Sequence, residues 1–170
     1  MIILGIDPGT AITGYGLIEA IGSRCRLLDY GCIRTTPGLS APRRLEKLHS
    51  GMMQLLAEGK PEQVAVEKLF FNRNATTAIP VGQARGVLLL ACAQNGLDVA
   101  EYTPLQVKQS IVGYGRAEKH QIQFMVARLL QMKAPPKSDD AADALALALT
   151  HAQFLLTRVL RGESAKGEDV

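Results

Sequence analysis

The hydrophobic pattern opens with a short apolar run, Ile2 to Ile6, in which polar and apolar positions do not alternate. Such a run is typical of a strand that is buried on both faces, and the turn residues Asp7-Pro8-Gly9 end it. Two further runs of strand-forming residues, 14–18 and 24–33, follow with glycines between them. The pattern therefore predicts three successive strands joined as an antiparallel meander.

Helical spacing begins after Ser40, a residue suited to an N-cap, and continues to about Gly59. A short strand at 64–66 and a loop at 69–78 are expected next, followed by a helix from about Pro80 to Gln94. Residues 87–93 of this helix are apolar all round. That pattern predicts burial on more than one side, or a subunit interface if only one layer covers the helix.

The rest of the chain alternates in the same way. A strand is expected at 99–102, followed by helices at 103–111, around 122–130 and at about 138–160, and the polar tail 162–170 is expected to be disordered. We expect one domain over residues 1–161. Its fold class is α/β, with a mixed central sheet of three antiparallel strands and then parallel strands, flanked by helices.

Composition narrows the class of protein. The 170 residues are 47% hydrophobic and 21% charged, which is an ordinary globular balance, and the net charge of +3 permits nucleic-acid binding without requiring it. The first apolar run is too short for a signal peptide or a membrane span, and three cysteines without metal-ligand spacing predict free thiols. We expect a soluble cytoplasmic protein that does not act at a membrane.

Four acidic residues stand where acids are costly. Asp7 and Glu67 each end an apolar strand, whereas Asp140 and Asp143 share one face in the first turn of an Ala- and Leu-rich helix. Clustered carboxylates favour Mg²⁺ or Mn²⁺, and two such ions about 4 Å apart can assist hydrolysis of a phosphodiester. Each acid has a simpler alternative: a turn for Asp7, an exposed strand edge for Glu67, and charge complementing a helix N-terminus for the aspartates, which we favour for Asp139.

Positive charge is concentrated in residues 103–137, where six basic residues stand against one acid, a local charge of +5 compared with +3 for the chain. The basic residues are Lys108, Arg116, Lys119, Arg128, Lys133 and Lys137. This segment could follow a phosphate backbone, although a solvated helix face is the simpler alternative. Phe70, Phe71 and Arg73 lie on the expected loop, where exposed aromatic side chains can stack on unpaired bases.

Several short blocks of this sequence, in this order, resemble those of the RuvC family. They are Ile3-Leu4-Gly5-Ile6-Asp7-Pro8-Gly9, Ala65-Val66-Glu67, Gly82-Gln83-Ala84-Arg85-Gly86, Val107-Lys108-Gln109, Ala117-Glu118-Lys119 and Asp140-Ala141-Ala142-Asp143-Ala144-Leu145-Ala146. The resemblance implies a ribonuclease-H-like fold. It also implies a homodimeric endonuclease that makes symmetric cuts in a four-way (Holliday) DNA junction during recombination and repair, leaving 5′-phosphate ends.

The resemblance also implies roles for single residues. The family's catalytic and metal-binding acids fall on Asp7, Glu67, Asp140 and Asp143, with two Mg²⁺ ions expected and Mn²⁺ able to substitute. Lys108 and Lys119 are implied to lie close to the cleaved phosphate, and Phe70 to probe the junction centre. Phe71, Arg73 and Arg116 are further expected DNA contacts. A branch-migration complex of the RuvA and RuvB type is implied as a partner.

Three other functions fit parts of the sequence. Gly5 to Thr10 resembles the phosphate loop of actin-like ATP-binding domains, but 170 residues leave no room for a second half and an adenosine motif. A junction-binding module without catalysis would need the basic segment but not four acids. A relative of the same fold that processes RNA is disfavoured only by the resemblance of the Phe70, Lys108 and Lys119 blocks.

Overall fold

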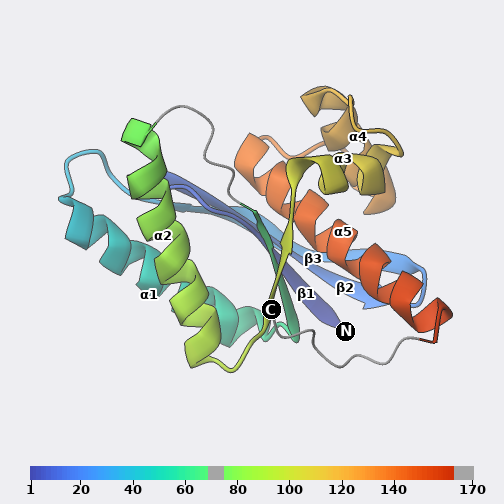
Figure 1. Ribbon diagram of the computed structural model, residues 1–170, viewed down its shortest axis with the longest axis horizontal. Coiled ribbons are helices and arrows are strands. Elements are labelled where there is room, and N and C mark those ends of the chain that lie inside the picture. Colours follow the sequence, from blue (N-terminus) through green and yellow to red (C-terminus); the bar gives the residue numbers. More distant parts are fainter. Residues whose placement is uncertain (69–74, 163–170) are drawn as a thin grey trace.

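A computed structural model describes residues 1–68 and 75–162, which form a mixed β-sheet with helices on both faces (Figure 1). The strands lie in the order β3-β2-β1-β4-β5. Their bounds are β1 Ile2–Asp7, β2 Ile12–Ile21, β3 Arg24–Arg34, β4 Gln63–Glu67 and β5 Val99–Tyr102. β1, β2 and β3 pair antiparallel, and β4 and β5 run parallel to β1. The predicted mixed sheet is confirmed.

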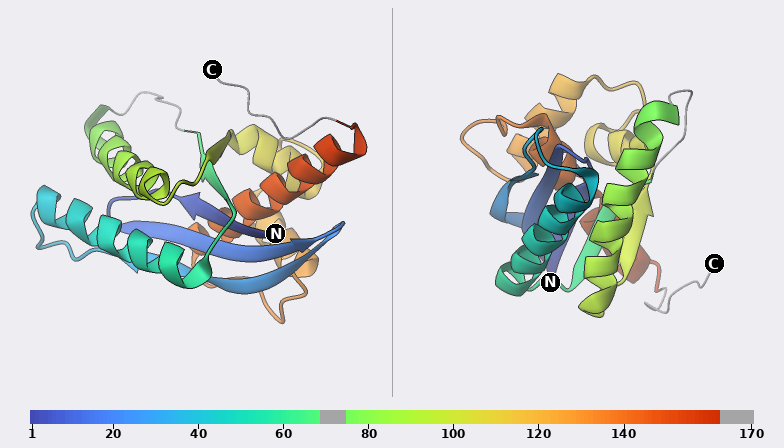
Figure 2. Two further views of the ribbon diagram at one scale, coloured as in Figure 1. Left: turned by 90° about the horizontal axis from the view of Figure 1, so that it is seen from below. Right: turned by 90° about the vertical axis from the view of Figure 1, so that its left-hand side faces the viewer.

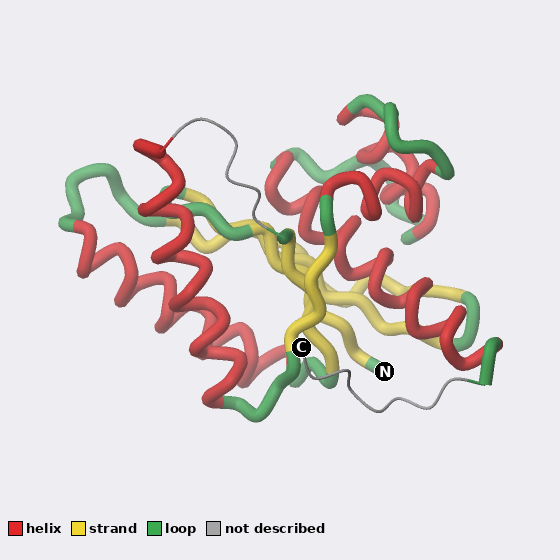
Figure 3. Tube along the Cα trace, in the orientation of Figure 1, coloured by secondary structure: helices red, strands yellow, loops and turns green. Residues whose placement is uncertain are grey.

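The described helices cover the two faces of this sheet unequally (Figure 3). Their bounds are α1 Ala41–Gly59, α2 Ala75–Gln94, α3 Pro104–Val112, α4 Lys119–Leu129 and α5 Asp139–Leu160. α1 and α2 lie side by side on one face (Figure 2), whereas α5 crosses the other face and is itself covered by α3 and α4. No helix in the described ranges is long and apolar enough to span a membrane.

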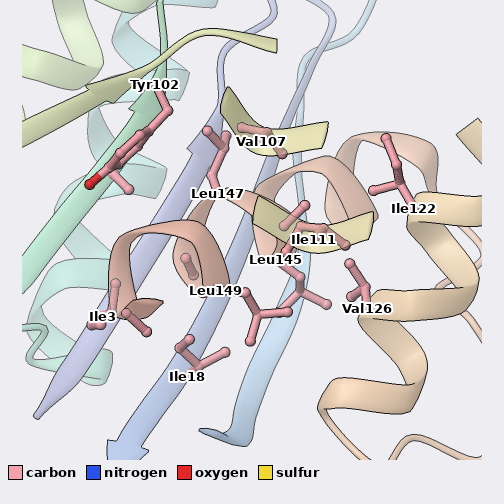
Figure 4. Close-up of a cluster of buried hydrophobic side chains, with 14 of the residues drawn as sticks. Ile3, Ile18, Tyr102, Val107, Ile111, Ile122, Val126, Leu145, Leu147 and Leu149 are labelled. Carbon is pink, nitrogen blue, oxygen red and sulfur yellow. The ribbon is translucent and has the colours of Figure 1, made fainter. Parts of the chain in front are cut away.

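Alternation of side chains along the strands separates the two faces. Leu4 of β1 and Val64 of β4 pack in a core cluster with α1 and α2. Ile3 and Ala65, one residue away on the same strands, pack in the second cluster with α5. Figure 4 shows Ile3 in this cluster beside Leu149 of α5. Counting on in steps of two from these residues places the strand-end acids of β1 and β4 on the α5 face of the sheet.

Two glycines allow α5 to lie directly on the sheet. A Cβ atom at Gly5 would collide with the carbonyl oxygen of Ala144, and one at Gly14 would collide with the carbonyl oxygen of Asp140. Gly14 also pairs with Asp7 across β1 and β2. The missing side chains therefore bring the first turn of α5 next to the end of β1.

The region around α2 differs from the sequence-based expectation. The helix begins at Ala75 rather than near Pro80, so residues 75–78 are helical and the proline lies inside the helix, where it removes one backbone hydrogen bond. The predicted burial of residues 87–93 on more than one side is also wrong, because Leu90 is 52% exposed. The helix with buried residues on nearly every side is α5, which lies between the sheet and α3 and α4.

The remaining expectations concern the cysteines and the chain end. All three cysteines are free thiols, as expected, and Cys92 is buried. β2 is longer than the predicted 14–18 run because it pairs along its whole length with β3. The predicted disordered tail falls almost entirely on 163–170, outside the described residues.

Candidate active site

The ends of two parallel strands place two carboxylates side by side. Ile6 of β1 pairs with Val66 of β4, so Asp7 and Glu67 follow as the last residues of adjacent strands at the same edge of the sheet. Both side chains face α5 because side chains alternate along a strand. The sequence predicted that Asp7 and Glu67 each end a strand, and the parallel register of β1 and β4 brings these two strand ends together.

The N-terminal part of α5 supplies the other acids. Asp143 lies one turn into the helix, and together with Asp7 and Glu67 it lines a cavity of about 260 Å³. The remaining lining residues are Pro104, Val107, Lys108, Lys119, Ile122 and Leu147. Three carboxylates from three separate elements therefore share one cavity, with a hydrophobic wall from α3, α4 and α5 behind them.

Burial and crowding of negative charge disfavour the ionised forms of these acids. Burial, followed by repulsion from Glu67, Asp143 and Asp140, raises the pKa of Asp7 to about 7, despite an opposing effect of Lys119. Burial and repulsion from Asp143 also raise the pKa of Glu67. The pKa of Asp143 is raised chiefly by burial, although Lys119 opposes the shift. Groups with pKa values perturbed in this way are typical of functional sites.

Lys119 forms ion pairs with two aspartates of α5. Its Nζ lies 3.3 Å from Asp143 Oδ2 and 3.2 Å from Asp139 Oδ2. Burial alone would lower the pKa of Lys119, but attraction to Asp143 and these hydrogen bonds outweigh it and raise the pKa. Gln123 donates to Asp139 at 2.8 Å, so α4 holds that aspartate on the outer side of the lysine. Asp139 therefore does more than complement the helix N-terminus.

Asp140 occupies a different position from Asp143. It is half-buried, it is not among the residues that line the cavity, and its Oδ2 accepts a hydrogen bond from Ser138 Oγ at 3.3 Å. Its negative charge nevertheless contributes to the raised pKa of both Asp7 and Asp143. Asp140 is thus close enough to share the electrostatic field of the site.

The other predicted site residues divide into three groups. Lys108 lines the cavity from α3, on the same wall as Val107. Arg116 is exposed in the segment between α3 and α4 and does not line the cavity. Phe70, Phe71 and Arg73 lie outside the described residues.

Sequence reasoning missed the residues that support the site. Gln123 donates a hydrogen bond to Asp139, and Ser138 donates one to Asp140. Nothing in the sequence except nearby charged residues indicated either contact. Nor did the sequence indicate the buried hydrogen bond between Tyr102 and His151. Tyr102 is the neighbour of Glu67 in the pairing of β4 with β5, and its hydroxyl lies 2.7 Å from His151 Nδ1. The His151 side chain is buried at this hydrogen bond.

The donor chemistry of the site fits a hard divalent cation. All the candidate ligands are carboxylate oxygens, which Mg²⁺ and Mn²⁺ prefer. Holding several buried negative charges together is unfavourable, and this is why the pKa of Asp7 is raised. A bound cation would offset that unfavourable charge repulsion. Among residues 1–68 and 75–162, no group of three acidic, histidine or cysteine side chains already has the close geometry of a metal-binding cluster. The acids gather at one site without converging on one point.

The fold and the site together define a class of protein. The strand order and mixed directions of the sheet are those of a ribonuclease-H-like fold, and acids from β1, β4 and α5 meet at one edge of it. Carboxylates clustered at the edge of the sheet, with lysines beside them, are typical of nucleases that hydrolyse phosphodiester bonds.

Comparison with known proteins identifies the family. A sequence model of the family described as crossover junction endodeoxyribonuclease RuvC matches residues 3–151, and the chain belongs to this family. Crossover junction endodeoxyribonuclease RuvC of Desulforamulus reducens is 59% identical over 157 residues, covering 92% of this chain and 96% of that protein. The same enzyme of Desulfitobacterium hafniense is 61% identical over 152 residues, covering 89% and 92%.

Solved structures agree in fold. A structure of Thermus thermophilus RuvC in complex with Holliday junction substrate matches with a TM-score of 0.87 and 38% identity, covering 92% of this chain and 96% of that one. The yeast mitochondrial Holliday junction resolvase Ydc2 matches with a TM-score of 0.68 at 12% identity and supports the fold alone. The family and the ribonuclease-H-like fold expected from the sequence are confirmed.

Proposed function

We propose that this protein resolves four-way DNA junctions by symmetric, metal-dependent hydrolysis of phosphodiester bonds in recombination and repair. The observation that carries the proposal is the meeting of Asp7, Glu67 and Asp143, from three elements, at one cavity with Lys108 and Lys119. The chain's membership of the RuvC family supports this activity. The related Thermus thermophilus protein, which binds a Holliday junction, supports the same substrate class.

Asp7, Glu67, Asp140 and Asp143 are the residues that would hold the metal. We propose two Mg²⁺ ions, with Mn²⁺ able to replace them, because oxygen-only ligands suit both ions. When bound, such a pair lowers the pKa of the attacking water and stabilises the charge on the leaving oxygen. The protein contributes the carboxylates, held by two strands and a helix whose positions are fixed by packing.

The lysines act on the substrate rather than on the metal. Lys108 and Lys119 place positive charge on the cavity wall, where it attracts the phosphate and stabilises the additional negative charge of the transition state. Asp143 and Asp139 hold the Lys119 ammonium in place, so this lysine loses little freedom when substrate binds. The hydrophobic wall behind the acids limits the access of bulk water and strengthens these charge interactions.

The outer face of α2 supports a homodimer. Ile79 is 69% exposed and Leu90 is 52% exposed. Gly82 and Gly86 lie between them along the helix, and a Cβ atom at either glycine would meet nothing within 4 Å. Apolar side chains flanking bare glycines allow a second copy of the helix to approach closely, and a two-fold dimer supplies two active sites for two symmetric cuts.

The remaining parts of the proposal rest on the family resemblance. Phe70, Phe71, Arg73 and Arg116 would contact DNA, with Phe70 at the centre of the junction. A branch-migration complex of the RuvA and RuvB type would present the junction, and the protein would act in the cytoplasm. The cuts would leave nicked duplexes with 5′-phosphate ends.

A labelled synthetic four-way junction and a linear duplex of the same sequence test the proposal, each incubated with Mg²⁺ or with EDTA. We expect paired nicks at symmetric positions in the junction only, and only with Mg²⁺. Junction binding without cutting under any divalent metal would instead support a binding module. Equal binding and cutting of the junction and the linear duplex would overturn the proposal.

A further inference from the structure

A second cavity, of about 680 Å³, lies toward the β3 edge of the sheet, away from the acid-lined cavity over β1 and β4. We call it the β3 groove. Its lining comes from β3, from the segment between α4 and α5, and from the first turn of α5: Leu27, Tyr30, Gly31, Cys32, Arg34, Met132, Lys133, Ala134, Pro135, Lys137, Ser138 and Ala141. Nothing in the mechanism proposed above uses this groove.

The charge of the β3 groove has one sign. Arg34, Lys133 and Lys137 are its charged lining residues, all three are exposed, and none of its described lining residues is acidic. This concentration is notable in a chain whose net charge is only +3. An open groove with cations on both walls matches an extended polyanion better than a compact neutral ligand.

The groove lies in line with the carboxylates. Asp7 pairs with Gly14 of β2, and Gly14 pairs with Cys32 of β3, so Asp7 and Cys32 belong to one row that crosses the sheet. Adjacent strands are about 4.8 Å apart, which places the floor of the groove about 10 Å from Asp7. Neighbouring phosphates of one DNA strand are farther apart through space than the ~3.4 Å that separates them along the helix axis, because the strand winds around the axis, so this distance spans no more than the next few phosphates.

The groove and the acidic cluster also share a side chain. Ser138 Oγ lies 3.1 Å from Cys32 Sγ in the floor of the groove and 3.3 Å from Asp140 Oδ2. Ser138 is the N-cap residue of α5, so the wall of the groove is continuous in sequence with the N-terminal part of α5, which carries Asp140 and Asp143. A DNA strand bound in the groove would therefore have a fixed position relative to the acids.

We infer that the β3 groove binds the phosphate backbone of the DNA strand within a few nucleotides of the cleaved bond, and so fixes the register of the cut. This inference rests on the proposed function. The groove contributes affinity and positioning through Arg34, Lys133 and Lys137, whereas Lys108 and Lys119 act at the cleaved phosphate itself. Contacts to phosphate position a protein on DNA without reading its sequence.

The test compares two charge-matched double variants for binding of a four-way junction in Ca²⁺ or EDTA over a range of salt. Lys133→Gln with Lys137→Gln removes two cations of the groove. Arg24→Gln with Lys60→Gln removes two exposed cations at the opposite end of the sheet. Thermal unfolding of both proteins checks that they are folded.

We expect the groove variant to bind the junction about tenfold or more weakly at moderate salt, and its plot of log affinity against log salt to be shallower by about two. The control should match the wild type. Single-turnover cutting of fully bound junction should keep its rate, but the mapped cut positions should spread because the register is less fixed.

Equal effects of the two double variants would overturn the inference, because they would reflect net charge alone. A groove variant with unchanged affinity, salt slope and cut positions would also overturn it, and would leave the groove to an acidic protein partner. In both cases a wild type that binds and cuts the junction leaves the proposed function intact. A wild type that ignores the junction would overturn the proposed function, and this inference with it.

Discussion

Gly14 lies directly opposite Asp7 in the antiparallel pair of β1 and β2, and a side chain there would collide with the backbone of α5 at Asp140. The absence of one side chain thus brings together acids that are more than 130 positions apart in the sequence. The position of α5 on the sheet, rather than any local motif, determines whether Asp143 can share a cavity with Asp7.

Gly14→Ala should therefore damage the site and the fold together. The added methyl group must push α5 away from β2, which we expect to lower the free energy of unfolding by about 1–3 kcal/mol. Cutting of the junction should fall because Asp143 moves with the helix. Urea unfolding and a junction-cutting assay measure the two effects.

Gly38→Ala is the matched control, since a Cβ atom at Gly38 would meet nothing within 4 Å. It should leave stability and cutting close to those of the wild type. A Gly14→Ala protein with wild-type cutting would show that the close approach of α5 is not needed for activity.

Asp7→Asn should stabilise the metal-free protein at alkaline pH. The pKa of Asp7 is raised to about 7 from 3.8, so the folded protein binds this proton more tightly than the unfolded chain, and the wild type loses stability as pH rises between about 4 and 7. Above pH 7 the ionised carboxylate costs up to about 4 kcal/mol, which the amide avoids. Urea unfolding in EDTA should show a variant that gains stability over the wild type as pH rises from about 5 to 8.

Asp98→Asn serves as the control for that experiment, because Asp98 is exposed in the turn before β5 at the far end of the sheet. Its difference from the wild type should not change with pH over the same range. If Asp7→Asn were less stable than the wild type at pH 8, the raised pKa would be the wrong account of this carboxyl group.

Metal binding should compete with the proton on Asp7. Mg²⁺ needs the ionised carboxylate, so its affinity for the wild type, measured by calorimetry, should increase from about pH 6 to pH 8. At 100 times its Kd the metal should stabilise the wild type by about 2.7 kcal/mol, and Asp7→Asn by much less. Equal stabilisation of both proteins by Mg²⁺ would place the metal elsewhere.

The exposed face of α2 predicts how the proposed homodimer can be disrupted. Leu90→Glu puts a charge into the proposed apolar contact, so a wild type that sediments as a dimer should become monomeric with this change. Monomers should nick the junction on one strand at a time. Ile21→Glu changes a side chain that is 59% exposed at the end of β2, and it should leave the dimer intact. A Leu90→Glu protein that remains dimeric would exclude this face as the interface.

Much of the fold follows from patterns that are local in the sequence. The unbroken apolar run of β1 predicted a strand covered on both faces, and turn residues after Ile6 located its end at Asp7. The start of α2 could not be predicted in this way, because Pro80 is equally suited to a first turn and here lies one turn further in. Likewise, the apolar residues on every side of α2 do not reveal whether the side of the helix away from the sheet is covered by the same chain or left exposed.

Candidate residues for the site could be proposed from the sequence, but their arrangement in space could not. A spacing of three put Asp140 and Asp143 on one side of α5, but only the packing of the helix shows that Asp143 lines the cavity while Asp140 contacts Ser138. The ion pairs of Lys119 join α4 to α5, and no local pattern connects such distant positions. Long-range contacts of this kind depend on how the elements pack.

The most direct test of the central claim is to measure binding and cutting of a four-way junction by Asp7→Asn side by side with Asp98→Asn. We predict that Asp7→Asn binds the junction like the wild type, whereas its cutting rate with Mg²⁺ falls by about 10³-fold or more, equal to about 4 kcal/mol of lost transition-state stabilisation. Asp98→Asn should bind and cut normally. Undiminished cutting by Asp7→Asn, or loss of binding together with cutting, would contradict a catalytic role for the carboxylate at the end of β1.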